Sequence, residues 1–323
     1  MSTIQYTKSP GVPPQSMEAE FLSHKNGSEW WYCTGYLNDK FGKLYTFQFT
    51  LVKVKIFGIS VHVLMTALSN FDNGQHHYSQ RVFFFGRNVN ITSDLVGVNG
   101  QAEMRFFERR LDLSISAKEY SLSLNMDIAK APVWHCDDGV LRMGIDDPKQ
   151  TTYYWSYTNL RATGELVLGN KHLTVSGKAW FDRQGGTFSI FNRQTHWEWF
   201  SIRFFDDEEV MLFSFPQSNY RDGTYIDKSG KYKRFTNYGI TPLGFTEAGG
   251  YKFSFGWKVK LPGIKDEVFT ITPKMDGQLN LAYYELLADA IDINGNIVGF
   301  CVVELLPGVY SENVKVRGIL ARQ

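Results

Sequence analysis

The chain has 323 residues, of which 43 % are hydrophobic, 15 % aromatic and 21 % charged, and its formal net charge is +1. Its charges are dispersed along the sequence, which excludes the basic surface of a nucleic-acid-binding protein and a polybasic membrane patch. The length predicts two domains.

The cysteines and the apolar segments bear on the compartment. Cys33, Cys136 and Cys301 are far apart and lack metal-type spacing, so we expect buried free thiols and no disulfide framework. Residues 1–11 lack the basic and then apolar pattern of a secretory signal. The apolar run 61–68 is too short to span a bilayer. These features predict a cytoplasmic protein without a membrane segment.

The N-terminal residues 1–24 are predicted to form an arm that precedes the first domain. Pro10, Pro13 and Pro14 favour an extended chain. A short helix is predicted over residues 15–24.

The segment 28–37 combines three adjacent large aromatic residues with a strand-like pattern. Because side chains alternate between the faces of a strand, Trp30 and Tyr32 are predicted to point to one side, and Glu29 and Trp31 to the other. Indoles on both faces indicate a strand with apolar contacts on each side. Each indole could belong to a core or to the wall of a ligand pocket.

Alternating apolar and polar residues then dominate the chain, as expected for half-buried antiparallel strands. The clearest examples are residues 45–51, 111–117, 122–128, 172–179 and 251–261. No amphipathic helix of substantial length is predicted. Many short strands separated by turns indicate an all-β protein built as sandwiches or barrels.

Turn dipeptides separate these runs. We place the domain boundary after the strand at residues 153–160, which divides the chain into domains at 25–162 and 163–323. The predicted turns are Asn99-Gly100, Asp138-Gly139, Asp222-Gly223, Asp276-Gly277 and Asn294-Gly295.

Several catalytic signatures are absent from the sequence. It contains no Walker loop, no dinucleotide-type glycine fingerprint, no Gly-x-Ser-x-Gly elbow and no His-Glu-x-x-His motif. His76 and His77 beside Asp72 could contact a metal, but a solvated loop is the preferred interpretation because no further ligand has suitable spacing. We therefore predict no metal and no cofactor.

Asp182 is the main candidate for acid–base chemistry. It follows an apolar run that ends in Trp180 and Phe181. Burial among aromatic rings would raise the pKa of its carboxyl and suit it to act as a general acid near neutral pH. The alternative is a structural role, either in an ion pair with Arg183 or in capping a turn.

His196 and Glu198 are further candidates, predicted to share one face of a strand whose other face carries Trp197 and Trp199. An inward His/Glu pair could orient a substrate or relay a proton, and the alternative is a structural cross-strand pair. Together, the predicted catalytic residues are Asp182, Arg183, His196, Glu198 and Tyr157. The predicted substrate-binding residues are Trp31, Tyr154, Trp155, Trp180, Trp197, Trp199 and Trp257.

An ordered set of segments resembles the AttH/CrtC lipocalin-like family, which includes carotenoid 1,2-hydratases. The matches cover residues 28 to 306. They are Glu29-Trp30-Trp31-Tyr32 with Gly35, the Tyr153–Leu160 segment, Gly177-Lys178-Ala179-Trp180-Phe181-Asp182, Trp197-Glu198-Trp199-Phe200, Tyr284-Glu285 and Gly299–Leu305.

The resemblance implies two packed lipocalin-like domains with a largely apolar pocket, and Asp182 as the acid of the hydratase type. Related lipocalin-like folds include Diels–Alderases. The sequence departs from the family pattern after Asp182, where Arg183-Gln184-Gly185-Gly186 replaces His, then Glu or Gln, then Trp-Gly. The adjacent guanidinium of Arg183 is expected to keep Asp182 ionised, which opposes the general-acid role.

Three functions therefore stay open. The preferred one is a cofactor-independent enzyme that folds an extended hydrophobic substrate, such as a polyene, polyketide or terpenoid, and promotes its cyclisation or isomerisation. In that case Tyr154, Tyr157, Arg183 and His196 are the candidate hydrogen-bond donors. The second is a hydratase of an isoprenoid double bond. The third is a non-catalytic carrier of a lipophilic molecule.

Overall fold

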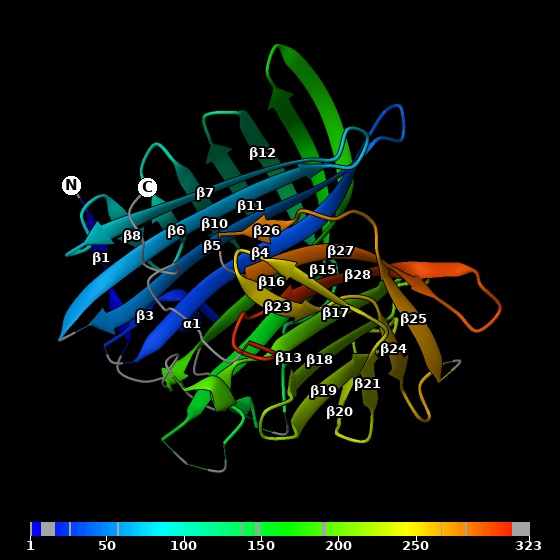
Figure 1. Cartoon of the computed structure of the whole chain (residues 1–323). Coiled ribbons are helices and arrows are strands. Elements are labelled where there is room, and N and C mark those ends of the chain that lie inside the picture. The colour runs from blue at the N-terminus through cyan, green and yellow to red at the C-terminus, as the bar shows by residue number, and fades with distance from the viewer. Residues whose placement is uncertain are drawn as a thin grey trace.

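The computed structural model consists almost entirely of β-strands arranged in two large curled sheets (Figure 1). Strands coloured blue to green build the first sheet, and strands coloured olive to red build the second. The prediction of an all-β fold built from two packed β-sheet units is confirmed. The structure describes residues 2–7, 17–25, 27–56, 58–136, 138–145, 147, 149–188, 192–265, 267–281 and 283–311.

The first sheet has 14 strands, all antiparallel to their neighbours except for the parallel pair β1 and β8. Its centre is formed by the long strands β15, β16 and β4, which build one side of the site described below. Across the sheet the order is β1 (Thr3–Ile4), β8 (Val89–Ile91), β9 (Leu95–Val98), β10 (Ala102–Phe107), β11 (Arg110–Ser116), β12 (Tyr120–Ile128), β15 (Thr151–Leu168), β16 (Lys171–Thr187), β4 (Ser28–Asp39), β5 (Leu44–Ile56), β6 (Ile59–Asn70) and β7 (Gln75–Phe84), with β13 (Val133–Trp134) and β14 (Val140–Arg142) also paired to β15.

The second sheet has 10 strands, and β17 and β28 lie at its centre. Its order is β20 (Tyr232–Phe235), β19 (Tyr220–Ile226), β18 (Glu209–Phe215), β17 (Glu198–Phe204), β28 (Ile297–Leu305), β27 (Tyr283–Ile291), β25 (Val268–Pro273), β24 (Trp257–Lys260) and β21 (Gly239–Pro242), with β26 (Leu279–Asn280) paired to β27. The smaller elements are the β2 (Tyr6–Thr7) and β3 (Ser23–His24) pair, the β22 (Phe245–Ala248) and β23 (Tyr251–Ser254) pair, the helix α1 (Met17–Phe21) and the 3-10 turn η1 (Arg193–Thr195).

Most of the predicted strands are present, and two local predictions are wrong. Residues 251–261 form two strands because Gly256 adopts a positive φ of 75° and interrupts the run. Asp222-Gly223 lies inside β19, where the Asp222 carboxylate pairs with Arg234 at 2.7 Å. The predicted helix at 15–24 is shorter, at Met17–Phe21, and the prolines of the predicted arm lie outside the described residues.

The passage from the first sheet to the second falls between Thr187 and Glu198. The boundary predicted between residues 162 and 163 instead falls inside β15. The reason is that β16 pairs with β4 along its length, although the two strands are far apart in the sequence. Hairpin signals show where a strand ends but not which sheet the next strand joins.

Three hydrophobic cores follow from strands that are buried on both faces. One core fills the curl of the first sheet and includes Trp31, Trp155 and Phe181. A second core, around Phe200 and Trp257, lies on the face of the second sheet that points away from the first sheet. The third lies between the two sheets and is rich in aromatic side chains, namely Tyr32, Tyr36, Tyr154, Trp180, Trp197, Trp199, Phe213 and Phe215.

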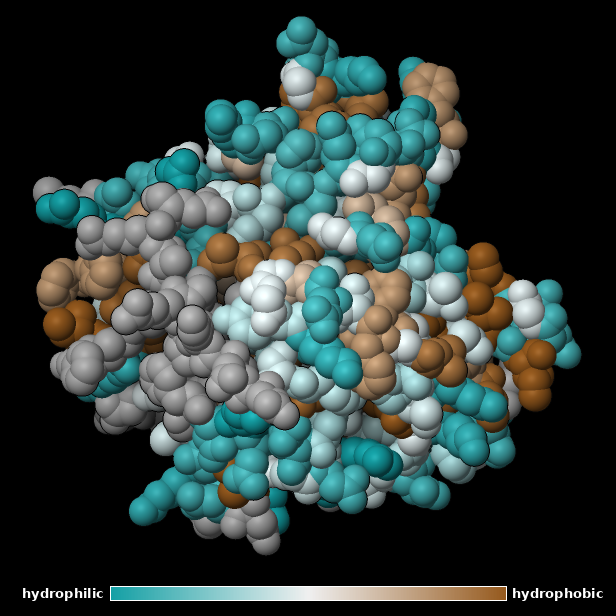
Figure 2. Space-filling model, in the orientation of Figure 1, coloured by the Kyte–Doolittle hydropathy of each residue, from teal (hydrophilic) through white to brown (hydrophobic). Residues whose placement is uncertain are grey.

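The outer surface agrees with this burial. On the face shown in Figure 2, hydrophilic residues cover much of the described surface and apolar residues form separate patches. Large exposed hydrophobic side chains such as Phe41 and Ile293 lie in turns. Single exposed apolar residues are normal for a folded protein, so the apolar content of the chain is mainly internal.

Polar contacts also fix the two sheets against each other. Lys130, from the first half of the chain, pairs with Glu209 of β18 at 2.6 Å. Asn159 of β15 donates to the other Glu209 oxygen at 2.7 Å. Lys178 of β16 reaches Asp207 at 2.6 Å. The ion pair of Lys130 is buried, so it constrains the relative position of the sheets and hence the cavities between them.

Arg183 anchors the N-terminal segment to the first sheet. Its guanidinium pairs with Glu29 at 2.6 Å and donates to the carbonyl oxygens of Glu20 and Leu22 at 3.0 and 2.8 Å. It also lies 4.0 Å from the centre of the Trp31 ring. Burial alone would raise the pKa of Glu29, but Arg183 and its other polar neighbours hold it well below its usual range.

We expect Arg183→Met to lower the free energy of unfolding by about 3–5 kcal/mol, because it leaves the buried carboxylate of Glu29 without its main partner. Urea denaturation of the full chain measures this change. The matched control is Arg105→Met, since Arg105 is half-exposed and its contact with Glu103 is long, at 3.9 Å. The control should change stability by less than about 0.5 kcal/mol. Equal effects of the two substitutions would contradict the anchoring role.

Candidate functional site

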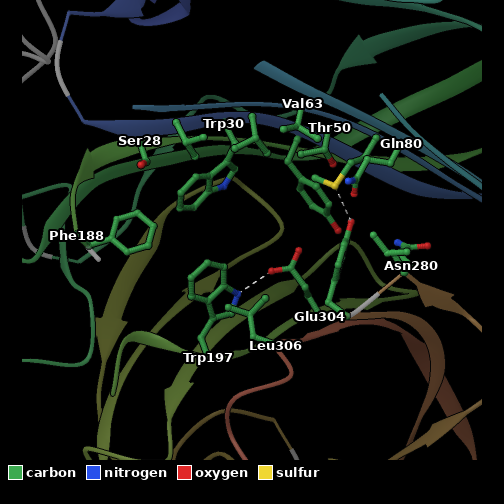
Figure 3. Close-up of a pocket in the computed structure, with 16 residues that line it drawn as sticks. Ser28, Trp30, Thr50, Val63, Gln80, Phe188, Trp197, Asn280, Glu304 and Leu306 are labelled. Atoms are coloured by element: carbon green, nitrogen blue, oxygen red, sulfur yellow. Dashed lines mark hydrogen bonds between the residues drawn. The ribbon is translucent and has the colours of Figure 1, made fainter. Parts of the chain in front are cut away.

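Two adjoining cavities lie between the sheets, and Figure 3 shows the larger one. The larger has a volume of about 140 Å³ and an almost entirely apolar wall. The smaller has a volume of about 20 Å³, which is enough for one water molecule. Four residues line both cavities, namely Trp30, Tyr32, Trp197 and Glu304. The larger cavity is further lined by Ser28, Thr50, Val52, Val54, Val63, Met65, Gln80, Phe188, Asn280, Leu281, Tyr283 and Leu306, and the smaller by Asp182, Gln184, Trp199 and Phe213.

The alternation of strand side chains explains which residues reach the cavities. Trp30 and Tyr32 of β4 face the second sheet, while Trp31 between them faces the first core. Likewise Trp197 and Trp199 face the first sheet, and Glu198 points the other way. The alternation predicted for residues 29–32 is confirmed, as is the opposite orientation of Glu198 to Trp197 and Trp199. The prediction that His196 shares a strand face with Glu198 is wrong, because β17 begins at Glu198 and His196 follows the 3-10 turn η1.

An aromatic wall forms one end of the larger cavity. The rings of Trp30 and Trp197 are stacked with their centres 5.9 Å apart. Phe188 packs edge-on against both indoles. In Figure 3 these three side chains lie together on one side of the cavity, and Gln80 and Asn280 lie on the other. Such a wall can hold a flat or extended apolar molecule.

Asp182 of β16 lies at the smaller cavity, surrounded by hydrogen-bond donors. The indole N–H of Trp180 donates to Oδ1 at 2.6 Å, and the hydroxyl of Ser156 donates to the same oxygen. The hydroxyl of Tyr154 donates to Oδ2 at 3.0 Å and accepts from Trp199 at 3.1 Å. Three donors therefore hold the carboxyl in one orientation.

Burial raises the pKa of Asp182 to about 7, although the three hydrogen bonds and the charge of Arg203 act in the opposite direction. The expectation that Arg183 keeps Asp182 ionised is wrong. Adjacent residues of a strand point to opposite faces, and Arg183 is paired with Glu29 on the other side of the sheet. Asp182 and Arg183 also lie within β16 and not at a turn, so a turn-capping role is excluded.

A second carboxyl group, Glu304 of β28, faces both cavities. The indole N–H of Trp197 donates to its Oε1 at 2.6 Å. Burial, with a smaller contribution from the charge of Asp182, raises the pKa of Glu304 to about 7. Two neighbouring carboxyls that repel each other favour a state in which one is protonated and the other is ionised. The site can thus supply an acid and a base near neutral pH.

A third buried acid lies behind this pair. Glu285 of β27 is directly opposite Glu304 in the strand register, and it accepts a hydrogen bond from the hydroxyl of Tyr32. Burial and the charge of Glu304 raise the pKa of Glu285 well above its usual value. This shift favours the neutral form of Glu285, which adds no charge to the site.

A buried histidine, His135, orients one of the hydrogen-bond donors to Asp182. His135 contacts Ser156 through Nε2 at 2.7 Å and Thr224 of the second sheet through Nδ1 at 2.9 Å. Burial lowers the pKa of His135 to about 3, so the ring is neutral. Because Ser156 donates its single proton to Asp182, it must accept from Nε2–H, and Thr224 donates to Nδ1. This chain orients the Ser156 hydroxyl toward the carboxylate.

The structure brings together several of the residues predicted to form the site. Asp182, Trp197 and Trp199 line the cavities, and Tyr154 and Trp180 hold Asp182 from within the core between the sheets.

The other predicted site residues lie elsewhere, so their assignment is corrected. Trp31, Trp155, Tyr157 and Arg183 face the core of the first sheet, and Trp257 faces the core of the second. Glu198 accepts a hydrogen bond from Ser254 on that same outer side. The ring of His196 packs against Gly308, where an added Cβ would clash with it.

Sequence reasoning did not select Trp30, Tyr32, His135, Glu285 or Glu304 as site residues. The available signal was a carboxylate inside an otherwise apolar strand, as in the segment 299–305. Such a residue must find a partner or remain neutral when buried. Which cavity it faces depends on the packing of two sheets, which the strand pattern does not contain.

The contacts of His76 and the state of the three cysteines bear on the predictions about metals and thiols. His76 contacts Ser69 and Asn280, and none of the described residues form a cluster of three or more His, Cys, Asp or Glu side chains suited to a metal ion. All three cysteines are free and buried, as predicted. In the part of the chain that the structure covers, no helix has the length and apolar character needed to span a membrane.

Comparisons with known proteins agree with the fold. The structure is similar to that of an AttH protein from Nitrosomonas europaea, with a TM-score of 0.77 and 22 % identity over 88 % of this chain and 93 % of that one. It is similar to kievitone hydratase from Nectria haematococca, with a TM-score of 0.71 and 16 % identity over 95 % and 96 %. A more distant similarity is to CghA, solved with Sch210972, with a TM-score of 0.50 and 10 % identity over 91 % of each chain.

No curated protein matches the sequence significantly. The family model described as AttH-like matches residues 13–308, which is nearly the whole chain. The chain therefore belongs to the AttH-like family.

Proposed function

We propose that the protein is an enzyme that adds water to, or removes it from, a carbon–carbon double bond of an apolar substrate. The observation that carries this proposal is the pair of carboxyls, Asp182 and Glu304, at the junction of an apolar cavity and a water-sized one. The larger cavity would hold the substrate, and the smaller would hold the water that reacts. Kievitone hydratase, which has the same fold, is named for a hydration reaction.

The number of donors assigns the two roles. Asp182 accepts three hydrogen bonds, which stabilise its ionised form, whereas Glu304 accepts one from Trp197 and borders the apolar cavity. Glu304 therefore keeps the shared proton and acts as the acid, and Asp182 acts as the base. This reverses the assignment that the family resemblance implies, in which Asp182 is the acid.

The proposed hydration conserves atoms and charge. The proton of Glu304 forms a new C–H bond at one alkene carbon, and the water oxygen forms a C–O bond at the other. Asp182 accepts the proton that the water loses. A proton passing from Asp182 to Glu304 through the smaller cavity restores the starting state, and the net change is the addition of one water.

Cyclisation or isomerisation of an extended substrate is the second candidate. The aromatic wall of Trp30, Trp197 and Phe188 could hold a chain in a reactive conformation. This was the preferred function from the sequence, because Arg183 was expected to disable Asp182 as an acid. With Arg183 on the opposite face, that objection to hydration no longer applies.

The direct test is to incubate the protein with apolar conjugated alkenes in ¹⁸O-labelled water and to analyse the products by mass spectrometry. Hydration gives a product that contains one labelled oxygen. A product of unchanged mass but altered structure would favour cyclisation or isomerisation instead. Recovery of every bound alkene unchanged would favour a carrier.

We expect Asp182→Asn to lower kcat by about a hundred- to ten-thousand-fold, the usual contribution of general acid–base catalysis. The amide has nearly the same shape, so the melting temperature should change little. Asp112→Asn on β11 is the matched control, because Asp112 pairs with Arg110 far from the cavities and should leave kcat unchanged. Turnover by Asp182→Asn at the wild-type rate would exclude the proposed base.

We also expect kcat/KM to show a bell-shaped pH dependence with its maximum near pH 7. Below it, Asp182 becomes protonated and cannot act as a base, and above it, Glu304 loses the proton that it must donate. The two apparent pKa values belong to the pair. In Glu304→Gln the fall at high pH should disappear from the residual activity. A variant profile with both limbs unchanged would contradict the role of Glu304.

A further inference from the structure

We propose that the larger cavity contains a binding site for a carbonyl oxygen of the substrate, formed by the hydroxyl of Tyr283 at the end opposite the aromatic wall. This inference rests on the proposed function and narrows the substrate class to an apolar molecule whose double bond is conjugated to a carbonyl group.

The first observation is that the hydrogen of the Tyr283 hydroxyl has only a weak acceptor. Its oxygen accepts a hydrogen bond from Nε2 of Gln48 at 2.7 Å, so its single proton must point elsewhere. That proton meets the thioether sulfur of Met65 at 3.7 Å. The dashed line at the yellow sulfur in Figure 3 marks this contact. A thioether is a weak acceptor, and both side chains line the larger cavity.

The second observation is that the orientation of Gln48 is determined by its other contacts. Its Nε2 also donates to Thr50 at 2.9 Å, which uses both amide protons. Its Oε1 accepts from Nδ2 of Asn280 at 2.6 Å. The amide therefore can only donate to Tyr283, and the phenol must direct its proton into the cavity.

The series of hydrogen bonds continues from Asn280 to His76 and Ser69 of the first sheet. Oδ1 of Asn280 contacts Nε2 of His76 at 2.8 Å, and Nδ1 of His76 contacts Ser69 at 2.9 Å. Because Nδ2 of Asn280 donates to Gln48, Oδ1 of Asn280 must accept from Nε2–H of His76. Burial lowers the pKa of His76, which favours the neutral ring. Every donor in the series points toward Tyr283. Aligned donors polarise one another and strengthen the last one.

The position of Tyr283 fits a conjugated carbonyl. Tyr283 and Glu285 lie on the same face of β27, and Glu285 is directly opposite Glu304. Tyr283 and Glu304 are thus diagonal neighbours, with Cα atoms roughly 7–8 Å apart. A carbonyl bound to Tyr283 would place its conjugated double bond next to Glu304 and the smaller cavity.

The chemistry gives Tyr283 a defined part in the reaction. When water adds to the carbon distant from the carbonyl, the electron pair of the double bond moves toward the carbonyl oxygen. Asp182 takes the proton of the water, and Glu304 delivers a proton to the carbon next to the carbonyl. A donor aimed at that oxygen stabilises the negative charge that develops on it.

The test uses two probes of similar shape, 4-phenylbut-3-en-2-one and the oxygen-free 1-phenylbut-1-ene. Isothermal titration calorimetry measures the affinity of each, and infrared spectroscopy measures the carbonyl stretch of the bound ketone. We expect the wild-type protein to bind the ketone more tightly than the hydrocarbon. Tyr283→Phe should weaken ketone binding about tenfold and change hydrocarbon binding less than about twofold. It should also shift the carbonyl band to higher frequency.

Two further variants serve as controls for this result. Tyr284→Phe is the matched control, since its ring packs against Phe253 in the second core and should leave both affinities unchanged. Met65→Leu removes the competing sulfur at similar volume, and it should increase the preference for the ketone. Equal affinity of the wild type for both probes, failure of the ketone to bind, or the same loss for both probes in Tyr283→Phe would each overturn the inference.

The proposed reaction is tested separately. Glu304→Gln should lose turnover but keep the preference for the ketone. If Glu304→Gln turned over at the wild-type rate while Tyr283→Phe lost the ketone preference, the acid–base proposal would fail and the carbonyl site would stand. If Tyr283→Phe kept the preference while Glu304→Gln lost turnover, only the carbonyl site would fail.

Discussion

Burial of the central strands on both faces is the constraint on which the rest of this structure depends. Along the buried parts of β4 and β16, successive residues alternately face the curl of the first sheet and the second sheet. Neighbours in the sequence therefore serve unrelated purposes. Asp182 belongs to the cavity between the sheets, whereas Arg183 binds Glu29 and the N-terminal segment. The side chains of these two adjacent residues are therefore separated by the full thickness of a sheet.

Burial of several acids between two sheets would be costly without compensation. The protein compensates in two ways. Asp182 is surrounded by three donors, one of which, Ser156, is oriented by His135. Glu304 and Glu285 have fewer donors, and burial raises the pKa of each, so that protonation removes charge. A neutral acid beside a carboxylate that accepts several hydrogen bonds is the arrangement that acid–base catalysis at neutral pH requires.

The polar groups of the larger cavity are ordered in the same way. The side chains from Ser69 through His76, Asn280 and Gln48 to Tyr283 form one directed series of hydrogen bonds that crosses between the sheets several times. Because each amide and ring has its orientation set by a neighbour, the last donor is already aligned before any ligand binds. Such preorganisation costs little at the moment of reaction. The same contacts hold the sheets together, so the site and the interface depend on one another.

Local periodicity and turn chemistry were enough to predict the strand-rich character of the chain, the two faces of residues 29–32 and the hairpin at Asn294-Gly295. The apolar run before Asp182 also identified it as a buried acid. Three features depend on how the strands assemble, namely that β16 joins the first sheet, that Arg183 faces away from Asp182, and that Glu304 lies at the same cavity as Asp182. Strand pairing and sheet packing join residues far apart in the chain, whereas periodicity describes one strand at a time.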